Sequence, residues 1–430
     1  MIDFLKNAVS PYHASAYIRQ KLKQAGFCEL KTEEEWELKN ETGYYICPFG
    51  TTVIAFYVGK KSDRYALKIA ASHTDHPGFR IKENPEMRQG GYVKLNVESY
   101  GGAILNTWLD RPLSAAGSVW IKDMESAAGA VQELVDFGRP LFVIPNVSIH
   151  MNRELNDGAK LNKQVDMLPL AAIGMSGEFS FRGLIARYLW EKRGMSLDEN
   201  DILSWDMSIY NAESPVKVGV DEELLMAGGI DNASSEKACL DAIIEAPDKA
   251  PNGIAISAFF DHEEVGSRSK NGADSTMLSN IIERIYLALG LDRSGYLSAV
   301  MSGEFLSLDA AHATNPNHPE KYDPTSGVEL GSGVTIKCSS RQNYCTDGDM
   351  TARLLMLAGK NNIACSINYL RSDIPGGSTI GSLLSSQLPM RGADAGIPIL
   401  AMHSAMETMA LSDQLELEKL TKAFLNNLDC

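Results

Sequence analysis

Four apolar runs of this sequence end in histidine or acidic residues, which are the residue types that bind divalent metal ions. His73 follows YALKIAAS, Glu263 and Glu264 follow ISAFFDH, Asp309 follows FLSL, and His403 ends IPILAMH. Polar residues at the ends of buried strands are where α/β enzymes place their chemistry. Two imidazoles with several carboxylates and no cysteine favour zinc, manganese or cobalt in a catalytic rather than a structural site.

His73 and Asp75 flank a single residue, so in an extended chain both side chains face the same way. A metal-ligating imidazole usually donates its other N–H to a carboxylate. His73 is therefore a candidate ligand and Asp75 its candidate orienting partner. The alternative is a loop histidine that forms a salt bridge with its neighbour.

The run Asp261-His262-Glu263-Glu264 places adjacent carboxylates directly after an apolar strand. Such carboxylates repel one another unless cations compensate. One glutamate could hold a metal ion while the other acts as general base for water. An acidic turn exposed to solvent is the alternative interpretation.

Asp231 follows Gly228-Gly229-Ile230 and precedes a helical pattern, so a helix-capping role explains it equally well. Asp309 and His403, taken singly, could also be a capping Asp and a buried, hydrogen-bonded His. What favours a shared metal site is that chemically suitable residues recur at the ends of several apolar runs.

The elements that must position these residues form an α/β pattern made of two chain segments. Residues 86–225 differ, because short strands there alternate with Gly, Pro and Asn turns. We therefore expect a catalytic domain of residues 1–85 and 226–430 with a β-rich domain, 86–225, inserted into it. The periodicity predicts helices over 1–25, 183–194, 234–246 (capped by Asn232) and 279–290, and strands over 51–59, 65–72, 140–150 and 253–260.

The composition argues against nucleic-acid-binding, membrane-spanning and disulfide-rich proteins. The formal charge of −15 and pI near 5.1 argue against nucleic acid as a partner. No stretch approaches the ~20 apolar residues of a membrane helix, and the N-terminus lacks signal-peptide features. Seven cysteines without a CxxC pair predict neither a disulfide nor a zinc framework. We expect a cytoplasmic protein without nucleic-acid or membrane partners.

Taken in order, several segments resemble the aspartyl aminopeptidase family of dinuclear zinc metallo-aminopeptidases. They are ASHTDHPGFRIK, IPNVSIHMNRELN, GGIDNASS, FFDHEEVGS, LDAAHATNPNHPEKYD, GVTIK and LAMHSAMET. The resemblance covers nearly the whole chain. It implies a phosphorylase/hydrolase-like three-layer α/β domain with an inserted dimerisation domain, in a homo-oligomer built from dimers, a dodecamer.

The resemblance also implies a role for each site residue. Two divalent ions per subunit, zinc first with manganese or cobalt as alternatives, would be held by His73 and Asp309 on one side, Glu264 and His403 on the other, and Asp231 between them. Glu263 would be the general base and Asp75 the carboxylate that orients His73. His312 and Lys337 would contact substrate. His150 would reach the active site of a neighbouring subunit and stabilise an oxyanion there.

The implied reaction removes the N-terminal residue from peptides with free N-termini, through a water that the two cations share. Members of this family prefer either acidic or neutral, apolar N-terminal residues, and the metal motifs do not separate them. Lys337 is the candidate that favours an acidic preference. Two rivals remain: a carboxypeptidase or deacylase with the same centre, and a non-catalytic self-assembling scaffold or cargo particle.

Overall fold

The computed structural model describes residues 1–62, 65–158, 160–174, 179–249 and 252–427. Its central element is a nine-stranded sheet in the order β1-β2-β3-β13-β4-β14-β18-β16-β17. The middle strands β13, β4 and β14 are parallel, so their carboxyl ends lie at one edge of the sheet. The nine strands are β1 Cys28–Leu30, β2 Thr42–Ile46, β3 Val53–Val58, β4 Ala66–His73, β13 Gly253–Phe260, β14 Glu304–Leu308, β16 Val334–Cys338, β17 Cys365–Tyr369 and β18 Arg391–Gly396.

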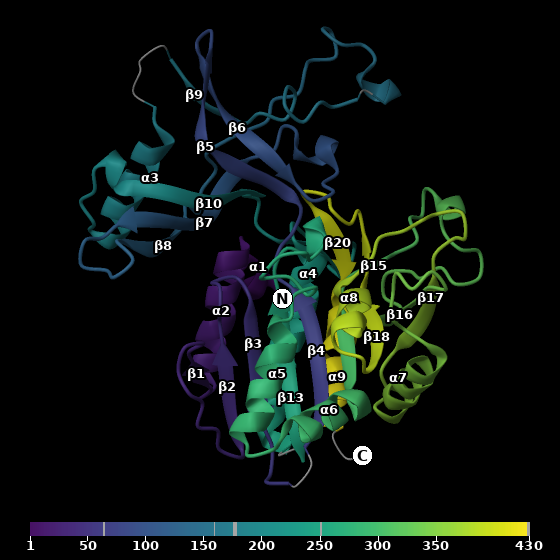
Figure 1. The fold of residues 1–430 in the computed structure, drawn as a ribbon. Helices are drawn as coiled ribbons and strands as arrows, with labels where there is room; N and C mark the ends of the chain where they lie inside the picture. The colour runs from purple at the N-terminus through teal and green to yellow at the C-terminus, as the bar shows by residue number, and fades with distance from the viewer. Residues whose placement is uncertain (63–64, 159, 175–178, 250–251, 428–430) are drawn as a thin grey trace.

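Helices cover both faces of this sheet (Figure 1). One apolar core contains side chains of α2, α4, α7 and α9, and another contains those of α5, α6 and α8. Strand β13 is buried along its whole length, as expected for a strand covered on both faces. The predicted three-layer α/β arrangement is confirmed. The helices are α1 Ile2–Asn7, α2 Pro11–Gln24, α4 Ile230–Lys249, α5 Met277–Ala288, α6 Arg293–Ser302, α7 Gly348–Lys360, α8 Ile380–Gln387 and α9 Leu411–Asn426.

A second, antiparallel sheet lies above the first in Figure 1, in the order β8-β7-β10-β5-β6-β9. With helix α3, Phe181–Arg193, it encloses an apolar core of its own. Its first strand begins at Gly78, ahead of the boundary expected at residue 86. The strands are β5 Gly78–Gln89, β6 Tyr92–Tyr100, β7 Leu113–Lys122, β8 Ala130–Asp136, β9 Leu170–Ile173 and β10 Ile202–Asn211.

A third sheet of five strands, β11-β12-β20-β19-β15, combines three separate chain segments, residues 216–227, 311–312 and 398–410. Its strands are β11 Val216–Val218, β12 Leu224–Ala227, β15 Ala311–His312, β19 Pro398–Leu400 and β20 Glu407–Ala410. Short 3-10 helices complete the described elements: η1 Leu105–Trp108, η2 Leu155–Asp157, η3 Glu199–Asp201, η4 Glu263–Val265 and η5 Pro319–Lys321. No helix within the described ranges is long and apolar enough to cross a membrane.

Three local predictions were wrong. The helix expected over 1–25 is two helices, because Ser10 caps α2 and Pro11 begins it. The strand expected over 140–150 is reduced to isolated bridges at 142–144. Pro145 follows directly and has no N–H for a sheet ladder. Asn232 does not cap α4, since its amide donates to the Leu308 carbonyl and its Oδ1 has no hydrogen-bond partner among the described residues.

Candidate metal centre

The carboxyl edge of the central sheet gathers the predicted residues. His73 is the last residue of β4, Glu263 and Glu264 begin η4 just after β13, and Asp309 follows β14. Asp231 lies in the first turn of α4, whose N-terminus faces the same edge. A cavity of about 320 Å³ opens there, and its lining includes His73, Asp231, Glu263, Glu264, Asp309, His312, Lys337, Tyr344 and His403.

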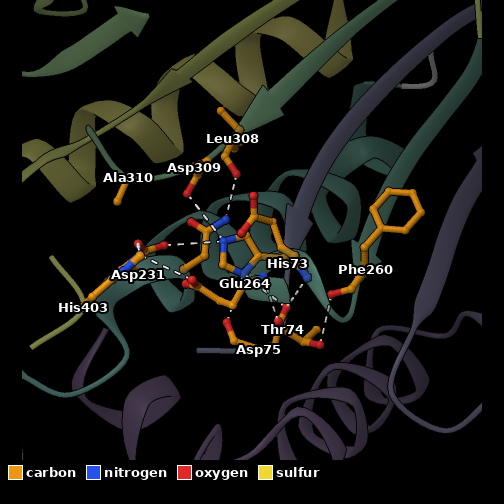
Figure 2. Close-up of polar contacts among 12 residues, drawn as sticks. His73, Thr74, Asp75, Asp231, Phe260, Glu264, Leu308, Asp309, Ala310 and His403 are labelled. Atoms are coloured by element: carbon orange, nitrogen blue, oxygen red, sulfur yellow. Dashed lines mark hydrogen bonds and ion pairs between the residues drawn. The ribbon is translucent and has the colours of Figure 1, made fainter. Parts of the chain in front are cut away.

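Asp231 lies between the two predicted histidine ligands (Figure 2). Its Oδ1 is 3.5 Å from His73 Nε2, and its Oδ2 is 3.6 Å from His403 Nε2. Oδ1 is buried and accepts no hydrogen bond from any described residue. A capping role therefore leaves this oxygen unexplained, whereas a shared metal ligand would use both oxygens.

Each histidine also faces a second carboxylate. His73 Nε2 is 3.5 Å from Asp309 Oδ1, and His403 Nε2 is 3.4 Å from Glu264 Oε2. Ligand atoms of His73, Asp231 and Glu264 all lie within 4.8 Å of one another. Atoms bound at about 2.0–2.2 Å to one tetrahedral zinc ion are separated by roughly 3.3–3.6 Å. The residues His73, Asp231 and Glu264 thus fit a divalent cation.

The charges of the cluster are unbalanced without cations. Burial raises the pKa of Glu264 well above its usual value, and the nearby charge of Asp231 adds to this. Burial likewise raises the pKa of Glu263 to about 8, against the opposing charge of His73. Burial alone would lower the pKa of His73, but the facing carboxylates raise it well above its usual value. A bound cation would stabilise the ionised carboxylates and the neutral imidazoles.

Asp75 connects His73 to the turn that carries the two glutamates. His73 Nδ1 is 2.9 Å from the Asp75 carbonyl oxygen and 3.5 Å from its Oδ1. The backbone N–H of Glu263 donates to Asp75 Oδ1 at 3.0 Å, and that of Glu264 donates to Oδ2 at 3.1 Å. Asp75 is therefore more than the partner of one histidine, because it also fixes the η4 turn.

The remaining predicted residues differ in their placement. His312, in β15, lines the cavity. Lys337, in β16, also lines it, and its Nζ donates to Asp309 Oδ2 at 3.2 Å and to the Ala310 carbonyl at 3.1 Å. His150 lies in an exposed turn and is not part of the cavity lining. The single chain thus brings together every predicted site residue except His150.

Sequence reasoning missed Glu407, a buried residue of β20. Its Oε2 accepts the backbone N–H of Asp231 at 3.0 Å, and its Oε1 accepts that of His403 at 2.7 Å. His403 has a φ of 68°, a left-handed conformation that costs a non-glycine residue about 1–2 kcal/mol. Glu407 helps to hold that backbone in place. The available signal was a lone acid four residues after His403.

The chain is similar to known proteins over nearly its whole length. A family model described as aminopeptidase I zinc metalloprotease (M18) matches residues 4–425. A probable M18 family aminopeptidase 2 of Clostridium novyi is 37% identical over 428 residues, which are 99% of this chain and 98% of that protein. A chain in the cryo-EM structure of the Ape4 and Nbr1 complex matches with a TM-score of 0.94 and 28% identity, covering 99% of this chain and 84% of that chain. A chain of the S. cerevisiae mApe1 dodecamer shares the fold, with a TM-score of 0.83, 22% identity, and coverage of 99% and 95%.

Proposed function

The chain belongs to the M18 family of aminopeptidase I zinc metalloproteases, and we propose on this premise that it removes N-terminal residues from peptides at a site for two divalent cations. The observation that carries the proposal is the position of Asp231, whose two oxygens face His73 and His403 separately. His73 and Asp309 would hold one cation, and Glu264 and His403 the other. Zinc is the proposed metal, with manganese or cobalt as alternatives.

In the proposed reaction the bound cations activate the substrate and the water, and side chains of the protein transfer the proton. When bound, the cations would polarise the scissile carbonyl and lower the pKa of the attacking water. Glu263 is the proposed general base: it lines the cavity beside the ligands without being assigned to either cation. It accepts a proton from the water and returns it to the departing amine. Asp75 keeps Glu263 in place through the hydrogen bond to its backbone N–H.

Recognition of a free N-terminus would make the enzyme an exopeptidase. The carboxylates of Asp231 and Glu264 lie in the cavity lining and can attract the α-ammonium group of a peptide. His312 lines the same cavity, at the side of Lys337, and is the proposed contact for the substrate backbone. A carboxypeptidase would instead recognise a free C-terminal carboxylate, and the assay below separates the two activities.

An acidic N-terminal residue is the proposed preference, with Lys337 as the group that attracts its side chain. Lys337 is a buried cation in the cavity lining, so an anionic group there would be poorly screened by water. The alternative is a neutral, apolar preference. The ion pair between Lys337 and Asp309 supports this alternative, because Asp309 offsets the positive charge that would attract an acidic side chain.

Assembly would complete the site. We assign the 86–225 insert as a dimerisation domain, in a homo-oligomer built from dimers and reaching a dodecamer, the state of the mApe1 relative. The exposed turn with His150 also exposes Val147, Ile149 and Met151, at 50%, 45% and 80% of their surfaces. Apolar side chains grouped in this way are typical of a surface that a partner covers. His150 would then donate a hydrogen bond in the neighbouring active site.

The proposed location is the cytoplasm, where thiols stay reduced, and the six described cysteines are all free. The function is tested by hydrolysis of X-Ala-Ala peptides with zinc, manganese or cobalt, beside the same peptides with an acetylated N-terminus. We expect release of residue X from the free peptides alone. Cleavage of the acetylated peptides, or release of the C-terminal alanine, would favour the carboxypeptidase or deacylase alternative. No hydrolysis with any metal would favour a non-catalytic particle.

A further inference from the structure

A short segment of the second sheet, residues 100–104, lies directly against the metal centre. Tyr100, the last residue of β6, donates its hydroxyl to Asp75 Oδ2 at 2.6 Å. The Gly102 carbonyl lies 3.3 Å from His403 Nδ1. The backbone N–H of Ile104 donates to the His403 carbonyl at 3.0 Å. One five-residue stretch thus contacts both a predicted ligand and the carboxylate that fixes the glutamate turn.

The two glycines of this segment allow its backbone to approach the ligands. Gly101 has a φ of +67°, and a Cβ atom there would lie 3.2 Å from Glu264 Cβ. A Cβ atom on Gly102 would lie 3.3 Å from His403 Nδ1. Both distances are shorter than ordinary van der Waals contact, so a side chain at either position would displace a ligand or the segment. Glycine inside or next to a strand often marks such a close approach.

We propose that residues 100–104 are a positioning segment, through which the inserted sheet sets the orientation of Glu264, His403 and Asp75. The Gly102 carbonyl accepts the Nδ1–H of His403, which leaves Nε2 free to face Asp231 and Glu264. Tyr100 donates to Asp75 Oδ2, whereas His73 faces Oδ1, so Tyr100 helps to hold the carboxylate that accepts two bonds from the η4 turn. No residue of this segment lines the cavity of the metal centre.

This inference rests on the proposed metal site and adds a structural consequence. His73, Glu264 and Asp309 lie at or just after the ends of strands of the nine-stranded sheet, but groups that orient the ligands come partly from the end of β6 in the other sheet. The metal centre is therefore incomplete without the inserted sheet. Substitutions in this segment should weaken metal binding although no ligand has changed.

The chain offers matched controls for each variant. Gly90 and Gly91 join β5 to β6 at the far end of the same strand, and a Cβ atom on either would meet nothing within 4 Å. Gly90 has a φ of +59°, so Gly90→Ala reproduces the backbone strain of Gly101→Ala without the contact. Gly91→Ala is the control for Gly102→Ala. Tyr210→Phe removes a tyrosine bond to Asp136 in the same sheet, as Tyr100→Phe removes the bond to Asp75.

The experiment measures the zinc affinity of the full-length protein by chelator competition, starting from metal-free protein. We expect Gly101→Ala, Gly102→Ala and Tyr100→Phe to weaken zinc binding by about 10- to 100-fold, as for other substitutions behind metal ligands. The control variants should match the wild type. The visible spectrum of cobalt-loaded protein should also change in the three test variants alone, because it reports ligand geometry.

Thermal unfolding of the metal-free proteins separates positioning from a general loss of stability. If an alanine variant does not fold, Tyr100→Phe decides the matter, because it removes one oxygen and adds no contact. Wild-type zinc affinity and cobalt spectra in folded Tyr100→Phe and Gly102→Ala would overturn the inference. A wild-type protein that binds no zinc would instead defeat the proposed function, so the two failures are distinguishable.

Discussion

Lys337 and Asp309 form a buried ion pair, with Nζ of the lysine 3.2 Å from Oδ2 of the aspartate. The other oxygen of Asp309 faces His73. The Asp309 carboxylate therefore lies between a proposed metal ligand, His73, and the charged side chain of Lys337. Burial alone would raise the pKa of Asp309, but the nearby charge of Lys337 outweighs this effect and lowers the pKa below its usual value. The Asp309 carboxylate therefore stays ionised. Lys337 thus contacts the metal centre as well as the cavity.

The proposed acidic preference predicts a substrate-dependent effect of Lys337→Met. Losing a hydrogen bond between charged groups costs about 1.5–3 kcal/mol, so kcat/KM for Glu-Ala-Ala should fall roughly ten- to a hundredfold more than for Leu-Ala-Ala. Lys68→Met is the control, because Lys68 forms a similarly buried pair with Glu304, at 3.1 Å, at the opposite end of β4. It should leave the substrate ratio unchanged. Equal losses for both peptides in Lys337→Met would support the neutral preference.

Glu407→Gln should weaken zinc binding although Glu407 is not a proposed ligand. Both carboxylate oxygens of Glu407 accept a backbone N–H, but the side chain of Gln has only one acceptor oxygen, and its NH2 group would face the other N–H. This unsatisfied donor should lower the free energy of unfolding by about 1–3 kcal/mol. Because the two N–H groups belong to Asp231 and His403, zinc affinity should fall about 10- to 100-fold.

Asp413→Asn is the control for this loss. Asp413 is buried and also accepts two backbone N–H groups, those of Gly331 and Gly333, away from the metal centre. Both variants should unfold at lower denaturant concentration, but only Glu407→Gln should lose zinc affinity. Zinc binding that is equal in the two variants would mean that Glu407 contributes to stability alone.

Glu263→Gln and Glu264→Gln should separate the general base from the metal ligand. Glu263→Gln should lower turnover by at least ~10²-fold while zinc content stays near that of the wild type. Glu264→Gln should lose zinc, because Glu264 Oε2 faces His403 Nε2 at 3.4 Å. Turnover and zinc content measured on the same samples check both expectations. Normal turnover of Glu263→Gln would place the base elsewhere.

The proposed role of His150 predicts complementation between subunits. His150→Phe should lower turnover by about 10²–10³-fold, the effect of losing one oxyanion donor. Mixed with Glu263→Gln subunits, it should recover part of the activity, because some sites then combine an intact Glu263 with the partner's intact His150. The measurement is turnover after subunit exchange, with mixing shown by mass labels. Proven mixing without recovery would mean that His150 does not act across an interface.

Much of the site could be predicted because its residues sit where apolar strands end. His73, Glu263, Glu264 and Asp309 follow β4, β13 and β14, and parallel strands bring their carboxyl ends together. That rule needs only hydrophobic patterning. The strands β4 and β13 were predicted nearly to the residue for the same reason.

Other contacts depend on tertiary packing that one sequence does not display. Glu407 contacts Asp231, 176 positions away, and Tyr100 contacts Asp75, 25 positions away. The position of Glu407 four residues after His403 does not reveal its contact with Asp231, and no local pattern marks Tyr100. The split between α1 and α2 was readable from Ser10-Pro11 but was outweighed by the helical spacing around it. The pairing of Lys337 with Asp309 depends on the register of β16 beside β18, which no local motif encodes.

The central claim is that Asp231 joins two cation sites that act together, and a zinc titration tests it most directly. Zinc is added to rigorously metal-free protein while release of the N-terminal residue from X-Ala-Ala is followed. We predict no turnover without metal and a rise that reaches its plateau at two zinc ions per subunit, with Asp231→Asn inactive throughout. Full activity in the metal-free protein, or a plateau at one zinc ion per subunit, would contradict the account.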